Sequence, residues 1–116
     1  MPEIGLTKFN AATVDSSKTG ASGAFTAVAG TTYSIDMSTG TPSADLVITL
    51  PTPDQGNACS FVLSGSDITH GVEFIATIGT VSYSSGGTYR LLATGDNVVF
   101  RYVDGAIGWL SDTLIN

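Results

Sequence analysis

The stretch that decides the fold is Asn97-Val98-Val99-Phe100-Arg101-Tyr102-Val103-Asp104-Gly105-Ala106-Ile107-Gly108-Trp109-Leu110-Ser111, near the end of the sequence. Apolar and polar residues alternate in both halves, and Asp104-Gly105 between them is typical of a two-residue hairpin turn. Such a turn predicts three cross-strand pairs: Phe100 with Trp109, Tyr102 with Ile107, and Arg101 with Gly108. Because aromatic cross-strand pairs contribute about 0.2–1 kcal/mol each beyond burial, we expect this hairpin to form the core of the domain.

Short alternating runs separated by Gly, Asp and Pro turns precede this hairpin and indicate further strands. The predicted strands are Thr32–Met37, Leu46–Leu50, Ala58–Leu63, Val72–Ile78, Val81–Tyr83, Tyr89–Leu92, Asn97–Val103 and Ala106–Ser111. Val81–Tyr83 and Tyr89–Leu92 are expected to pair as a hairpin, and no window keeps a helical periodicity. We therefore expect an all-β fold, a small antiparallel β-sandwich or β-barrel with an extended N-terminal arm. Its predicted core residues are Tyr33, Ile35, Ile48, Phe61, Phe74, Phe100, Tyr102, Ile107 and Trp109.

Residues 1–31 differ from the rest because they are small and polar and have few large side chains. Alone, such a segment cannot bury enough apolar surface to offset the entropy of ordering it. We expect residues 1–31 to be an arm held by neighbouring molecules, and residues 32–116 to form an antiparallel β-domain. The alternative is an N-terminal edge strand on the same domain, and both could hold. The apolar residues expected to contact these neighbours are Ile4, Leu6, Phe9, Val14 and Phe25.

The composition excludes several classes of function. The net charge is −6, with only four basic residues: Lys8, Lys18, Arg90 and Arg101. These cannot form the basic stripe that nucleic acid or an anionic membrane needs, so we expect neither as a direct partner. The N-terminus lacks a signal-peptide pattern, and no apolar run reaches membrane-spanning length. Charged residues are only 12% of the chain, and such a surface suits close contact with other protein.

Carboxylates are numerous enough, at ten, that a glycosidase-like pair cannot be dismissed by counting. Three of them lie in predicted turns, where aspartate bonds the local backbone: Asp54, Asp96 and Asp104. Asp36 and Glu73 lie within strands and are interpreted as solvent-facing or interface residues. A hydrolytic enzyme would have to use carboxylates such as Asp36, Asp45 and Asp67, and these carboxylates are the only feature that supports it.

The single histidine and the single cysteine cannot form a zinc set within one chain. His70 is interpreted as a solvated loop residue, although three copies could meet on the axis of a trimer. Cys59 is interpreted as a small buried apolar residue. We therefore predict no catalytic residue, no metal ligand and no cofactor.

Several motifs together resemble the small β-domains of tailed-phage virion proteins. These motifs are Tyr33-Ser34-Ile35-Asp36, Val47-Ile48-Thr49-Leu50-Pro51, Gly56 before an apolar strand, and Asp104-Gly105 followed by Gly108-Trp109. The resemblance covers roughly residues 33–111 and includes capsid decoration (cement) proteins, head fibres and tail-fibre modules. The short chain with its small-residue N-terminal segment is most similar to the decoration proteins.

The resemblance implies a non-enzymatic protein of the outer capsid surface, assembled in the cytoplasm of a host bacterium. It implies a homotrimer that clamps neighbouring subunits of the major capsid protein and stabilises the shell, with residues 1–31 supplying capsid contacts. The alternative is a receptor- or carbohydrate-binding module of a phage head or tail fibre. That module would stack sugars on the aromatic residues Tyr83, Tyr89 and Trp109.

Overall fold

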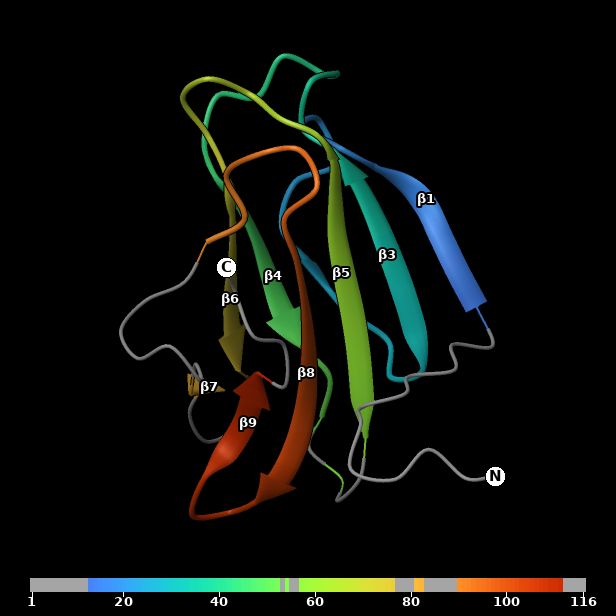
Figure 1. Cartoon of the computed structure of the whole chain (residues 1–116), viewed down its shortest axis with the longest axis vertical. Helices are drawn as coiled ribbons and strands as arrows, with labels where there is room; N and C mark the ends of the chain where they lie inside the picture. Colours follow the sequence, from blue (N-terminus) through green and yellow to red (C-terminus); the bar gives the residue numbers. More distant parts are fainter. Residues whose placement is uncertain (1–12, 53, 55–56, 77–80, 83–89, 112–116) are drawn as a thin grey trace.

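The computed structural model describes residues 13–52, 54, 57–76, 81–82 and 90–111. These residues form strands and connections and no helix, so the fold is all-β (Figure 1). The strands are β1 (Thr13–Thr19), β2 (Phe25–Thr26), β3 (Thr31–Asp36), β4 (Leu46–Leu50), β5 (Ala58–Gly65), β6 (Val72–Ala76), β7 (Val81–Ser82), β8 (Asn97–Asp104) and β9 (Gly108–Ser111). They build a six-stranded sheet in the order β1-β3-β5-β8-β9-β7 and a three-stranded sheet in the order β2-β4-β6.

The chain alternates between the two sheets from β1 to β6. Strands β1, β3 and β5 lie side by side in the large sheet, and β2, β4 and β6 lie side by side in the small one. Each return to a sheet runs in the same direction, so the pairs β1–β3, β3–β5, β2–β4 and β4–β6 are all parallel. The strand in the opposite sheet serves as the crossover that a parallel pair requires.

The prediction of an antiparallel domain was therefore wrong for most of the chain. Among the named strands, only β5–β8 and β8–β9 pair antiparallel, while β7 pairs parallel with β9. The physical reason is that alternation of apolar and polar residues reports which face is buried and not which way the neighbouring strand runs. The predicted hairpin between Val81–Tyr83 and Tyr89–Leu92 is not formed by their described residues: Val81 pairs with Trp109, and Leu91 forms an isolated bridge to Val72.

The β8–β9 hairpin exists, but its register differs from the predicted one. Tyr102 pairs with Trp109 and Asp104 with Gly108, so the connection is longer than two residues. The Asp104 carboxylate accepts hydrogen bonds from the backbone amides of Ala106 (2.9 Å) and Ile107 (2.8 Å), which hold this wider turn closed. Ile107 therefore lies in the turn with 42% of its surface exposed, and its assignment to the core was wrong.

Residues 13–31 belong to the two sheets. Strand β1 is the edge of the large sheet and β2 the edge of the small one, so the predicted boundary at residue 31 does not separate an arm from the domain. The alternative of an edge strand describes Thr13–Thr19. Hydrogen bonding to β3 and β4 orders this small, polar segment, which its own side chains could not do. The part of the predicted arm that precedes Thr13 lies outside the described residues.

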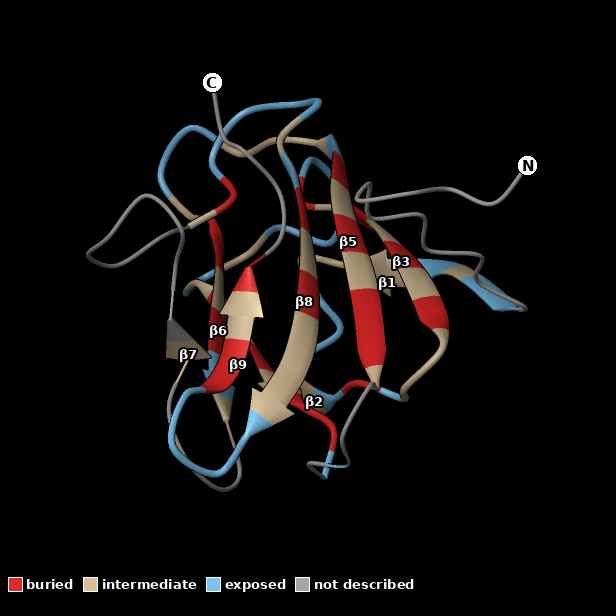
Figure 2. Cartoon of the chain, turned by 60° about the horizontal axis from the view of Figure 1, so that its bottom comes forward, coloured by how far each residue is buried: buried red, intermediate tan, exposed pale blue. Residues whose placement is uncertain are grey.

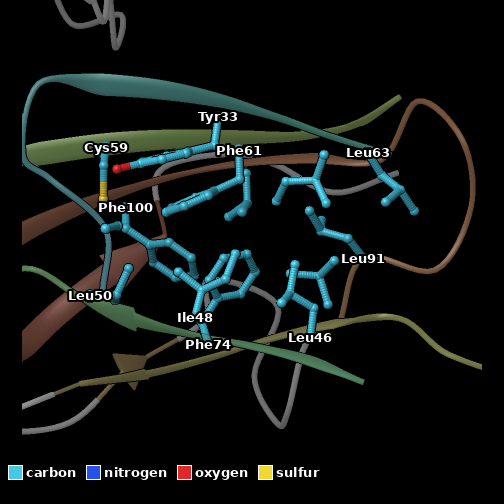
Figure 3. Close-up of a cluster of buried hydrophobic side chains, with 14 of the residues drawn as sticks. Tyr33, Leu46, Ile48, Leu50, Cys59, Phe61, Leu63, Phe74, Leu91 and Phe100 are labelled. Atoms are coloured by element: carbon cyan, nitrogen blue, oxygen red, sulfur yellow. The ribbon is translucent and has the colours of Figure 1, made fainter. Parts of the chain in front are cut away.

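The core lies between the two sheets and is rich in aromatic rings (Figure 3). Phe61 lies at its centre, with ring centroids 4.7 Å from Phe74, 5.5 Å from Tyr33 and 6.2 Å from Phe100. Buried and less buried residues alternate along β3 and β5, as expected for strands with one face against the core (Figure 2). Of the predicted core residues, seven are buried: Tyr33, Ile35, Ile48, Phe61, Phe74, Phe100 and Trp109. Tyr102 is half-buried and packs against this cluster.

Candidate functional site

Three loops meet at one end of the two sheets, and we call this region the loop end: residues 37–45, 66–71 and 90–96. It lies at the top of Figure 1. Hydrogen bonds join its loops, from Gly71 N to Asp45 Oδ1 (2.9 Å) and from the Thr94 hydroxyl to Ser66 Oγ (3.1 Å). Two of the carboxylates that a hydrolytic enzyme would have needed, Asp45 and Asp67, lie in these loops. The third, Asp36, ends β3 directly before the first loop.

Two of these carboxylates hold the local backbone. Asp36 Oδ1 accepts hydrogen bonds from the backbone amide of Ser38 (2.9 Å) and from its hydroxyl. Its partner across the ladder is Gly65, where an added Cβ would lie 2.1 Å from Asp36 Oδ1. Asp67 Oδ2 accepts from the amides of Thr69 and His70, each at 3.0 Å, and these bonds lower the pKa of Asp67.

The turn interpretation also describes Asp96 and Asp104. Asp96 Oδ2 accepts from the amides of Leu92 and Ala93, each at 3.0 Å, and closes the loop before β8. Asp104 closes the β8–β9 turn in the same way. In both places the carboxylate satisfies backbone donors that strand ladders leave unpaired. For Asp54, the described contact is a backbone one, from Asn57 N to the Asp54 carbonyl at 2.9 Å.

Asp45 differs from the others because it joins segments distant in sequence. Besides the Gly71 amide, it binds the Arg90 guanidinium, with 2.5 Å between Nη2 and Oδ2, and lies 3.7 Å from His70 Nδ1. Burial opposes ionisation of Asp45, but hydrogen bonds from Glu73, Gly71 and Arg90 outweigh it and lower the pKa of Asp45. The Asp45 hydrogen bond, burial and the Asp45 charge raise the pKa of Glu73.

The chemistry of these groups is limited. Among the described residues, no three His, Cys, Asp or Glu side chains are arranged to hold a metal ion. Cys59 is fully buried, and burial raises the pKa of its thiol to about 12, so it is no nucleophile at neutral pH. Trp109 is fully buried against Tyr102, with ring centroids 5.7 Å apart, and it offers no face for stacking on a sugar. Tyr83 and Tyr89 lie outside the described residues.

The predicted contact residues fall into three groups. Val14 on β1 is 68% exposed and available to a neighbour. Phe25 instead packs within its own chain, and its ring centroid lies 5.3 Å from that of Tyr33. The Nζ atom of Lys18 lies 4.3 Å from the centroid of the Phe25 ring. The remaining three lie outside the described residues: Ile4, Leu6 and Phe9.

The edge of the large sheet at β1, which we call the β1 edge, carries two features that oppose unspecific strand pairing. A bulge between Asp15 and Lys18 interrupts its register with β3, and the Asp15 carboxylate holds the bulge by accepting from Ser17 N (2.8 Å) and Oγ (2.6 Å). These bonds lower the pKa of Asp15. Lys18 points inward onto Phe25. Bulges and inward charges are the usual means of keeping an edge strand from aggregating.

Two features of the surface were missed by the sequence analysis. The first is the Asp45–Arg90 ion pair. No local sequence pattern predicts it, because its partners are 45 residues apart. The second is a set of exposed apolar side chains outside the predicted contacts: Val28, Ile68, Ile75, Leu92 and Ile107. Ile68 is fully exposed in its loop. The sequence could have indicated this exposure, because Ile68 is an isoleucine among polar loop residues.

The described surface therefore has three notable features: the acidic loop end, the Asp45–Arg90 ion pair, and a β1 edge whose bulge and inward Lys18 oppose strand pairing. Most of its carboxylates are engaged with backbone amides or with Arg90. The described residues include no apolar helix of membrane-spanning length. Comparison of the chain with protein-family models and with curated proteins gives no match.

Proposed function

We propose that the chain is a non-enzymatic virion protein, a small β-sandwich that decorates the outer surface of a phage capsid. In this proposal it trimerises and clamps neighbouring subunits of the major capsid protein, which stabilises the shell. The observation that carries the proposal furthest is the position of Thr13. It begins β1, the outermost strand of the large sheet, so the described part of the chain starts at an edge of the domain.

The use of the acidic groups supports a structural role. Asp36, Asp67, Asp96 and Asp104 each accept hydrogen bonds from local backbone amides. Asp45 is engaged by an arginine and a backbone amide. A general acid or base must be free to meet substrate, whereas these carboxylates keep loops in place. Loops fixed in this way suit a protein whose task is to present a constant surface.

The exposed side of β1 supports attachment near the N-terminus. Val14, itself one of the residues predicted to contact the capsid, is 68% exposed there. The bulge and the inward Lys18 disfavour unspecific pairing along the rest of this strand. A β1 edge that resists unspecific pairing would keep free subunits from associating before they meet the shell. The net charge of −6 also disfavours their association, because like-charged subunits repel each other.

The clamp would act by mass action. A protein that binds only the intact shell stabilises that state by RT ln(1 + [L]/Kd), about 2.7 kcal/mol per site at a hundredfold excess over Kd. Three linked subunits would raise this further, because each later contact forms within the same complex at a high effective concentration. Weak contacts by each N-terminal segment are therefore sufficient.

The test is binding to phage heads assembled without the chain. We expect the full chain to sediment with the heads, and a variant lacking residues 1–10 to remain folded but bind less. Two exposed β-branched residues provide a matched pair: Val14→Ser should weaken binding, whereas Ile75→Ser, at a 48% exposed position on β6 of the small sheet, should not. Equal binding by the truncated and full chains would refute the proposal. Specific binding of the isolated chain on a glycan array would favour the carbohydrate-binding alternative.

A further inference from the structure

The large sheet has an outer face, opposite the face that covers the core. Its strands β3, β5, β8 and β9 lie side by side (Figure 2). Each of them points an aromatic side chain into the core: Tyr33, Phe61, Phe100 and Trp109. Because successive side chains of a strand point to opposite faces, the neighbours of these residues point outward. The side chains of this surface, which we call the outer face, include Thr32, Ser34, Ser60, Val62, Val99 and Leu110.

The strand registers place these side chains in rows across the outer face. Ser60 lies opposite Thr32 on one side and opposite Val99 on the other. In the next row Ser34 lies opposite Val62. All of these residues are half-buried by their neighbours. The middle of the outer face is therefore built from hydroxyl groups and aliphatic side chains.

The outer face carries little of the negative charge of the chain. Its four strands contain two carboxylates, Asp36 and Asp104, and each is the last residue of its strand. Both carboxylates accept hydrogen bonds from the turns that follow, from the amides of Ser38 and Ile107. Arg101 is the one basic residue of these strands. In a chain of net charge −6, the groups that repel like molecules therefore lie away from the middle of this face.

Such a surface suits contact with other copies of the same chain. Residues near a symmetry axis meet their own copies, so a charged residue there would meet a like charge. A hydroxyl group can both donate and accept a hydrogen bond, so Thr32, Ser34 and Ser60 can bond to hydroxyl groups of another copy. A basic partner would instead be attracted to the carboxylates, which lie at the ends of these strands and elsewhere in the chain.

We propose that copies of this chain associate through the outer face of the large sheet. The contact supplies the self-association in the proposed function, on which the inference rests. Three of the four strands have six to eight residues. With about 4.8 Å between strands and about 3.3 Å per residue, the face covers about 400–500 Å². A standard interface takes about 800 Å² from each partner, so contact through this face alone is weak. Salt should strengthen it, because salt screens the repulsion between acidic copies.

The experiment is analytical ultracentrifugation of the full chain at concentrations up to about 1 mM, where even weak association is populated. We expect the average mass to rise above that of one chain with concentration, and to rise further at high salt. Ser60→Asp and Val62→Lys place charges of opposite sign on the outer face. Each should lower the association constant by about tenfold or more, because the new charge meets its own copy.

The matched control is Thr49→Asp, at a half-buried position on β4, the central strand of the small sheet. It adds the same charge as Ser60→Asp, and we expect it to associate like the wild type. Circular dichroism checks that each variant is folded. A wild-type chain that stays monomeric throughout the series would overturn the proposal, and so would unchanged association in both variants of the outer face.

Binding to heads assembled without the chain separates this proposal from the proposed function. Variants of the outer face that lose head binding but keep their self-association would show that the face contacts the shell, and the proposal would be wrong. A chain that associates through this face but does not bind heads would support the proposal and refute the proposed function.

A further measurement needs no variant. The methyl NMR signals of Val62 should shift as the chain concentration rises, whereas those of Ile75, 48% exposed on the small sheet, should not. Shifts at Ile75 with none at Val62 would contradict the proposal.

Discussion

Replacing Phe61 with alanine tests the described core at its centre. Phe61 is fully buried and contacts the rings of Tyr33, Phe74 and Phe100 at centroid distances of 5.5, 4.7 and 6.2 Å. Truncating a buried phenylalanine to alanine costs about 3–5 kcal/mol, because the removed atoms leave a cavity that the surroundings fill only in part. Three ring contacts, each worth about 0.5–1.5 kcal/mol, place Phe61→Ala at the upper end of that range.

This cost is a large fraction of the stability of a small domain, which is typically about 5–15 kcal/mol. Two variants calibrate the result. Phe61→Leu fills most of the volume and loses only the ring contacts, so we expect about 2 kcal/mol. Ile107→Ala changes a residue that lies exposed in the β8–β9 turn, and we expect a change within about 0.5 kcal/mol.

The assay is urea unfolding at constant pH, followed by circular dichroism and by Trp109 fluorescence. The dependence of unfolding free energy on urea should stay unchanged if only the stability of the native state changes. A loss below about 1 kcal/mol for Phe61→Ala would refute the described core, given the range for such truncations. A loss in Ile107→Ala as large as that in Phe61→Ala would restore the two-residue turn register, in which Ile107 belongs to the core.

Two further predictions concern single positions. An added Cβ at Gly71 would lie 2.7 Å from the Leu91 carbonyl oxygen, so Gly71→Ala should lower the free energy of unfolding in urea by about 1–3 kcal/mol. At Gly105 the nearest atom would be 3.9 Å away, so Gly105→Ala should lower it by less than about 0.5 kcal/mol. Equal losses for the two variants would contradict the described contact between the 66–71 and 90–96 loops. Burial raises the pKa of the Cys59 thiol to about 12, so a thiol reagent at pH 8 should modify the chain only as fast as it unfolds, and fast modification of the native chain would show that Cys59 is accessible.

The strands themselves were predictable where local signals were sharp. Leu46–Leu50 was predicted with its observed bounds, because this mostly apolar run ends at Pro51, which cannot donate to a ladder. The direction of pairing was not predictable, since β3 and β5 have the same alternation whether their neighbours run parallel or antiparallel. The hairpin register depended on where the Asp104 carboxylate bonds, and a turn dipeptide alone does not determine that.

In the candidate site, too, contacts local in sequence could be predicted and contacts between distant segments could not. The role of Asp96 in its turn could be predicted, because aspartate bonds amides within a few residues of itself. The contact between Asp45 and Arg90 could not, because it depends on how the parallel winding brings the start of β4 beside a segment 45 residues later. The neighbourhood of Asp45 and Glu73 follows from the β4–β6 register, which the expected antiparallel arrangement would have changed.

We have proposed that this chain strengthens a protein shell by binding its surface. The most direct test measures the temperature at which DNA-filled heads assembled without the chain release their DNA, before and after the purified full chain is added. We predict that added chain raises this temperature in a saturable way, and that the variant lacking residues 1–10 gives a smaller rise. Heads that release DNA at the same temperature with and without saturating chain would contradict the claim.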